Sequence, residues 1–207
     1  MPLGNILADF RNALAQCDNL VANSHRIDAA GASILPPLDQ QQITVAAFLN
    51  VFIAWESFLE ASLAELMIGL PTIGGKAPTR YVSPANLSAA RELVVGVMRF
   101  FDYGNHDNVR KVVSLYFDQG YPYEPHLKAI FSDLADLKTL RNCSAHIAAS
   151  TQIALESLAL RIFAKPMPGI TLYQMLMMND PRSATGETIF VSYKNKLSLT
   201  AQLIAHG

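Results

Sequence analysis

The sequence predicts an all-α protein, a helical bundle with additional helices at its N- and C-terminal ends. Apolar residues recur at intervals of three and four along most of the chain, and Gly and Pro are concentrated between these stretches. Only the stretch from Thr188 to Tyr193 could also form a strand. With 207 residues, of which 51% are hydrophobic and 16% charged, the chain can bury one substantial core, so we expect a single domain over residues 1–207.

The clearest helix is expected from about Leu38 to Ile68. Pro36-Pro37 precedes it, and the Gly-containing segment from Gly69 to Gly75 follows it. Its large apolar side chains are spaced to stack on one side: Phe48, Phe52, Trp55, Leu59, Leu63 and Leu66. Helical spacing among apolar neighbours is typical of a core, so we interpret this aromatic stripe as buried rather than as a platform for stacked bases.

The same periodicity predicts the other helices in order. They are expected at about residues 6–21, 87–101, 109–117, 127–149, 155–162, 170–178 and 187–205. We expect Ser83-Pro84 to begin the second of these, because a capping hydroxyl is followed by a proline suited to the first helical position. Tyr121 to Pro125 is predicted to be a rigid connector.

Composition limits the classes of function. The net charge of -1 gives no global basic signature, so any contact with RNA must come from a local patch. The excess of apolar over charged residues favours a homo-oligomer. Neither a targeting signal after Met1 nor an apolar run long enough to span a bilayer is evident, so we expect a cytoplasmic protein without a membrane. Cys17 and Cys143 are too far apart to define a metal site, and we expect no metal and no cofactor.

One segment carries residues suited to chemistry, Leu140 to His146. Arg141, Asn142 and His146 offer a cation for a phosphate, a hydrogen-bonding side chain and a group that moves protons near neutral pH. RNA cleavage needs no metal if the ribose 2'-hydroxyl is the nucleophile. Arg141 and His146 are separated by about 140 degrees on an ideal helix, so two copies around a two-fold axis would surround a phosphate better than one.

The arrangement of Arg141, Asn142 and His146 resembles the R-x4-6-H motif of the HEPN superfamily, in its x4 form with Asn after Arg. The likeness covers a core of about residues 38–178. Many HEPN proteins are ribonuclease toxins of toxin-antitoxin and other defence systems, and they act as homodimers that cut RNA in a shared cleft. The resemblance implies that His146 is the acid-base residue, that Arg141 stabilises the charged phosphate and that Asn142 orients it.

Further contacts follow from the same resemblance. A polar residue on the central helix contributes in some families, and Glu56 or Glu60 is the candidate here, although an exposed surface pair is the alternative. Lys138, one turn before Arg141, would bind a neighbouring phosphate or be solvated. The expected substrate is single-stranded RNA, because its linkages and bases are accessible. In a toxin-antitoxin pair, an antitoxin protein would be a second partner.

Other interpretations remain open at this point. Arg99 and His106 also fit the motif in its x6 form, but Gly104-Asn105 intervenes and we expect His106 to lie in a turn. The chain could be a non-catalytic HEPN-like module that binds a protein partner or a nucleotide. It could also be a plain helical assembly protein, which an ion pair from Arg141 to Asp133 or Asp136 would favour.

Overall fold

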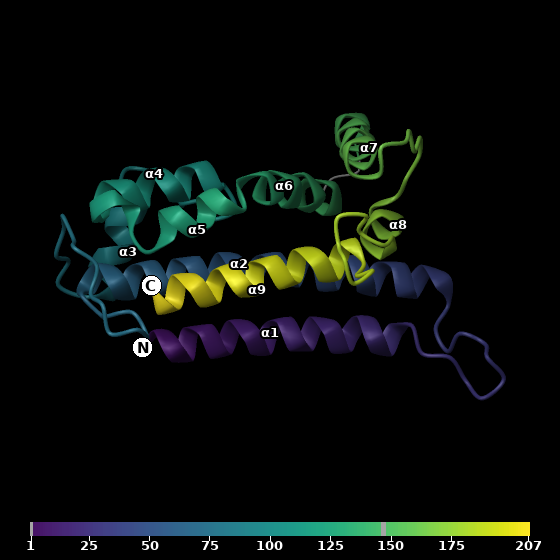
Figure 1. Cartoon of the computed structure of the whole chain (residues 1–207), viewed down its shortest axis with the longest axis horizontal. Helices are drawn as coiled ribbons and strands as arrows, with labels where there is room; N and C mark the ends of the chain where they lie inside the picture. Colours follow the sequence, from purple (N-terminus) through teal and green to yellow (C-terminus); the bar gives the residue numbers. More distant parts are fainter. Residues whose placement is uncertain (1, 146–147) are drawn as a thin grey trace. The chain divides into compact units, whose positions relative to one another are not determined.

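The structure is a computed structural model that describes residues 2–145 and 148–207. Over these residues it contains α-helices and one short 3-10 helix, and no strand is formed. The elements, shown in Figure 1, are α1 (Leu3–Ser24), α2 (Pro37–Ile68), α3 (Leu87–Val95), α4 (His106–Tyr116), η1 (Asp118–Gly120), α5 (Tyr123–Ala129), α6 (Phe131–Ala145), α7 (Ala149–Phe163), α8 (Leu172–Met177) and α9 (Ile189–His206). The predicted all-α fold is confirmed, including the helical state of the segment from Ile189 onward.

The chain divides into two compact units. Unit 1 comprises Met1–Arg11, Ala54–Leu134 and Lys196–Gly207, and unit 2 comprises Asn12–Ile53 and Ala135–Asn195. Helices α1, α2, α6 and α9 each contribute residues to both units. The single domain expected over residues 1–207 stays a prediction.

Helix α2 matches the predicted central helix closely. The aromatic and leucine side chains of the predicted stripe are all at most 3% exposed, so the stripe is core. The helix ends where Arg80 donates a hydrogen bond from Nη1 to the main-chain oxygen of Met67, at 2.8 Å. A cation at this end satisfies a carbonyl that the helix leaves unpaired and complements the helix dipole.

Helix α2 is also long and apolar enough to cross a membrane by length and composition. Its most apolar window has a mean hydropathy of 1.4, and 44% of that window is buried inside the protein. A core helix passes the same test, so this property is weak evidence for a membrane. The expected absence of a membrane stays a prediction.

The core of unit 1 is aromatic. The Phe10 ring lies 6.1 Å from the Trp55 ring and 5.4 Å from the Phe58 ring, measured between centroids. Tyr123 on α5 is fully buried, and its hydroxyl donates to Oγ of Ser62 at 2.9 Å. A buried hydroxyl needs such a partner, since leaving it unpaired would cost about 1–3 kcal/mol. This bond therefore fixes α5 against α2.

The capping residue and the end of α3 differ from the prediction, whereas its first residue, Leu87, agrees with it. Asn86, not Ser83, caps the helix, because its side chain accepts a hydrogen bond from the main-chain N–H of Ala89 at 3.0 Å. The helix ends at Val95 rather than near Phe101, because Gly96 adopts a positive φ of 59°. A residue without a Cβ reaches that region at no steric cost, and the chain leaves the helix there.

Two further expectations in unit 1 are wrong. His106 is the first residue of α4 rather than part of a turn, and its buried ring packs edge-on against Phe131 at 4.9 Å. The helix expected at 127–149 is two helices, because Ile130 leaves helical geometry with φ -112° and ψ 25° between α5 and α6. Helix α6, which carries the candidate site, therefore begins at Phe131.

Candidate functional site

Helix α6 positions three of the candidate residues within unit 2. Lys138, Arg141 and Asn142 are all half-buried. They lie within an arc of about 100 degrees on an ideal helix, because they are three and four residues apart. The C-terminal end of α6 lies beside α7 (Figure 1), where Sγ of Cys143 donates a hydrogen bond to the main-chain oxygen of Thr151 at 3.3 Å. The structure thus brings together the cationic and amide part of the predicted site.

A buried carboxylate anchors the same helix from another side. The Asp136 side chain is 5% exposed and forms an ion pair with Arg161 of α7. It also accepts a hydrogen bond from the hydroxyl of Tyr193 of α9 at 2.7 Å. Burial, together with the negative charge of Asp136, raises the pKa of Tyr193, so this phenol stays protonated and donates. Residues from α7 and α9 therefore hold α6 in place through one carboxylate.

A second carboxylate completes the cluster in unit 2. Asp180 accepts hydrogen bonds from Nε and Nη2 of Arg182 at 2.8 and 2.9 Å, and the Asp180 side chain is fully buried. The Arg182 guanidinium lies over the Tyr193 ring, 5.2 Å from its centroid, and Nη1 lies 3.7 Å from Oδ2 of Asp136. The two aspartates and the two arginines of this cluster balance in charge.

Arg141 has no carboxylate partner within the described residues. Asp133 binds Nζ of Lys196 at 2.6 Å, and Asp136 binds Arg161, so neither of the two acids nearest in sequence pairs with Arg141. The Arg141 guanidinium donates a long hydrogen bond from Nη1 to Oδ1 of Asn142, at 3.4 Å. Lys138 likewise forms no ion pair over residues 2–145 and 148–207. Two cations one helical turn apart are thus available to an anion.

The remaining predicted residues are His146, Glu56 and Glu60. His146 lies outside the described residues. Glu56 is half-buried on the part of α2 that belongs to unit 1, so its role beside Arg141 stays a prediction. Glu60 accepts an ion pair from Nε of Arg91 at 3.3 Å, with both side chains about half exposed. Glu60 thus has a partner on α3, and the i,i+4 pair on α2 that the alternative interpretation expects is not what this contact shows.

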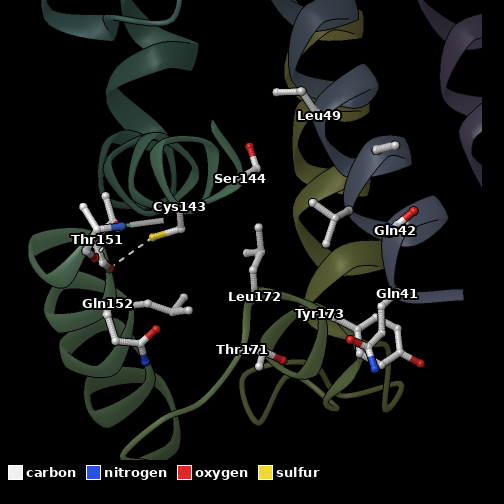
Figure 2. Close-up of a pocket in the computed structure, with 14 residues that line it drawn as sticks. Gln41, Gln42, Leu49, Cys143, Ser144, Thr151, Gln152, Thr171, Leu172 and Tyr173 are labelled. Atoms are coloured by element: carbon white, nitrogen blue, oxygen red, sulfur yellow. Dashed lines mark hydrogen bonds between the residues drawn. The ribbon is translucent and has the colours of Figure 1, made fainter. Parts of the chain in front are cut away.

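Sequence reasoning missed a cavity of about 530 Å³ in unit 2 (Figure 2). Its wall includes Cys143 and Ser144 of α6, which directly follow Arg141 and Asn142. Burial raises the pKa of the Cys143 thiol, which is half-buried. The other walls come from the beginning of α2, from α7 and from the beginning of α8. The run Gln40-Gln41-Gln42, which is polar at the start of an apolar helix, is the one sequence signal that could have indicated it.

Neither metal ligands nor known relatives assign a function to the described part of the chain. Over the described part of the chain, no group of three or more His, Cys, Asp or Glu side chains could hold a metal ion. No family of known proteins, no curated protein and no solved structure matches the chain. The resemblance to HEPN proteins therefore rests on the segment around Arg141 and on its helical setting.

Proposed function

We propose that this protein is a metal-independent endoribonuclease of HEPN type that cleaves single-stranded RNA by attack of the ribose 2'-hydroxyl on the adjacent phosphodiester. The observation that carries the proposal is the pairing of the charges on α6. Asp133 and Asp136 are neutralised by Lys196 and Arg161, which leaves Arg141 without a carboxylate in the described residues. A half-buried guanidinium without a carboxylate is suited to bind a phosphate.

In the proposed reaction, His146 removes the proton from the 2'-hydroxyl. The new bond joins the 2'-oxygen to phosphorus, the bond from phosphorus to the 5'-oxygen breaks, and the leaving oxygen takes a proton from a protonated His146 of a second copy. Arg141 neutralises the charge that develops on the phosphoryl oxygens, and Asn142 orients the phosphate. The products are a 2',3'-cyclic phosphate and a 5'-hydroxyl. The reaction takes up no water and requires neither a metal nor a cofactor.

The proposal includes a homodimer with a shared cleft. Unit 1 carries apolar side chains that are strongly exposed in one copy, with Val97 106%, Met98 66% and Phe100 71% exposed. Such a concentration of apolar surface is typical of an interaction surface. A role as a toxin or defence effector in the cytoplasm, with an antitoxin as partner, is part of the same proposal and rests on the resemblance.

A non-catalytic HEPN-like module remains the second candidate. The cavity in unit 2 favours it, because a space of about 530 Å³ is large enough for a small molecule or a nucleotide. The plain assembly protein is less well supported, since the ion pair from Arg141 to Asp133 or Asp136 that would favour it is not formed.

The proposal is tested by cleavage of labelled single-stranded RNA with the wild type and with Arg141→Ala and His146→Ala. We expect each substitution to lower the rate by about 100-fold or more, since a positioned acid-base group or charge contributes about that much. Arg11→Ala is the matched control. Arg11 is an exposed arginine of α1 that belongs to neither match to the motif, so its loss should leave the rate unchanged. RNA cleavage that Arg11→Ala lowers as much as Arg141→Ala would contradict the proposal.

A further inference from the structure

The cavity of unit 2 has a place in the proposed reaction. We propose that it binds one unpaired nucleobase of the RNA whose phosphate is held at Arg141. This inference rests on the proposed function, because it assigns to the cavity a part of the same substrate.

The cavity is lined by residues that directly follow the predicted phosphate site on α6. Ser144 lines it, and Ser144 follows Arg141 by three residues on α6. On a helix these two positions lie about 60 degrees apart around the axis and about 4.5 Å apart along it. Figure 2 shows the Ser144 side chain extending from α6 between that helix and α2. The proposal therefore assigns the phosphate and the base of one nucleotide to neighbouring positions of α6.

The side chains that form the walls of the cavity suit a nucleobase. None of the described residues that line the cavity is charged, so it suits a neutral group rather than a phosphate. Apolar side chains provide surfaces for the faces of a flat ring: Val45, Leu49, Leu155 and Leu172. The volume of about 530 Å³ exceeds that of one base and leaves room for part of the ribose. An apolar slot with a polar rim is the environment that a nucleobase needs.

The rim supplies a ring and two carboxamides. The Tyr173 ring is held in place by His25, which stacks on it at 6.1 Å with an interplanar angle of 9° and contacts its hydroxyl at 3.1 Å. Such a fixed ring is a surface on which a base can stack. Gln41 and Gln42 make no side-chain hydrogen bond within the described residues, and both line the cavity together with Tyr173. By contrast, Gln152 is already bonded to Glu156 and to the main chain of Ile170, at 2.8 and 3.1 Å.

The net charge of the chain limits the electrostatic part of RNA binding. At -1, the protein lacks the basic field that supplies most of the affinity in many nucleic-acid complexes. Binding of a base in an apolar slot adds affinity that does not depend on charge. The Gln41 and Gln42 carboxamides can donate to and accept from the edge of a base, which would give the site a base preference.

The test measures binding without cleavage. Short 2'-O-methyl RNA strands lack the nucleophile, so fluorescence anisotropy of a labelled strand reports affinity alone. A series of strands, each with one abasic position, is compared with the intact strand. For the wild type we expect one abasic position to weaken binding by about tenfold or more, the loss expected for a stacked base, and the other positions to have little effect.

Two variants give the test its control. Ala46 lines the cavity and is exposed at its mouth, so Ala46→Trp should fill the cavity without disturbing the core. Ile153 neighbours the lining residue Gln152 but points to solvent, with 64% of it exposed, so Ile153→Trp adds the same ring outside the cavity. Ala46→Trp should bind the intact strand about tenfold more weakly and no longer respond to the abasic position. Ile153→Trp should behave as the wild type.

The outcomes separate this inference from the proposed function. Equal binding of all abasic strands to the wild type, or equal behaviour of Ala46→Trp and the wild type, would overturn the nucleobase assignment even if natural RNA is cleaved. Binding that depends on one base, in a protein that cleaves no RNA, would support the nucleobase assignment and contradict the proposed nuclease activity. If melting shows that Ala46→Trp is unfolded, the double substitution Gln41→Leu and Gln42→Leu replaces it, with the same tenfold weakening expected.

Discussion

The anchoring of α6 by Asp136 predicts a measurable loss of stability in Asp136→Asn. The substitution keeps the size of the side chain and an acceptor for the Tyr193 hydroxyl, but it removes the negative charge that faces Arg161 and Arg182. Breaking a buried ion pair by removing one partner costs about 3–5 kcal/mol. The Arg161 and Arg182 side chains are 54% and 34% exposed, so water partly solvates the released charges. We therefore expect a loss of about 2 kcal/mol in the free energy of unfolding.

A matched control is Glu60→Gln, which also removes one carboxylate charge from an ion pair with an arginine. The Arg91 and Glu60 side chains are 50% and 44% exposed, and such pairs contribute about 0–1 kcal/mol. Urea unfolding followed by circular dichroism measures both variants, with an unchanged dependence on urea as the sign that stability alone has changed. If Asp136→Asn and Glu60→Gln lower the unfolding free energy equally, the anchoring role of Asp136 is wrong.

Further predictions concern stability, pH and assembly. Burial opposes ionisation of Asp180, but hydrogen bonds from Arg182 and Ser192 outweigh it and lower the pKa to about 2. Since this pKa lies below that of the unfolded chain, the stabilisation is present at pH 7 and is lost as the pH falls from about 4 to 2. Asp180→Asn should therefore cost about 2 kcal/mol in urea unfolding at pH 7 and approach the wild type near pH 2; a pH-independent difference would contradict this. Trp55→Ala should cost about 3–5 kcal/mol in the same assay, and a loss below about 1 kcal/mol would mean that the stripe is not core. Sedimentation equilibrium should give twice the chain mass of 22.6 kDa. A monomer at micromolar concentration would contradict the proposed homodimer with a shared cleft.

The sequence was sufficient to predict helices with a strong period and clear ends. Helix α2 has apolar residues on one face, Pro before it and Gly after it, so both its bounds and its buried stripe could be predicted. The break at Ile130 could not, because Leu127, Phe131 and Leu134 continue the apolar period across it. The cap of α3 was wrongly assigned because Ser83 and Asn86 are both good caps, and the choice depends on which side chain reaches the first turn.

The candidate site was predictable only in part. Arg141 and Asn142 could be placed on a helix because they follow the period of Leu137 and Leu140. The partners of Asp136 could not, because they come from α7 and α9 and meet it only in the folded chain. The cavity was missed for the same reason: its walls come from four helices, and each wall alone has an ordinary apolar pattern.

The chemical ends of the RNA products test most directly the proposal that the site around Arg141 cleaves RNA without a metal. A single-stranded RNA is incubated with the protein in EDTA, and the fragments are analysed by mass spectrometry, beside an RNA with one 2'-deoxynucleotide at the cleaved position. We predict fragments with 2',3'-cyclic phosphate and 5'-hydroxyl ends, no cleavage at the 2'-deoxynucleotide, and no fragments from Arg141→Ala. Fragments with 5'-phosphate ends, cleavage at the 2'-deoxynucleotide, or loss of all cleavage in EDTA would contradict the mechanism.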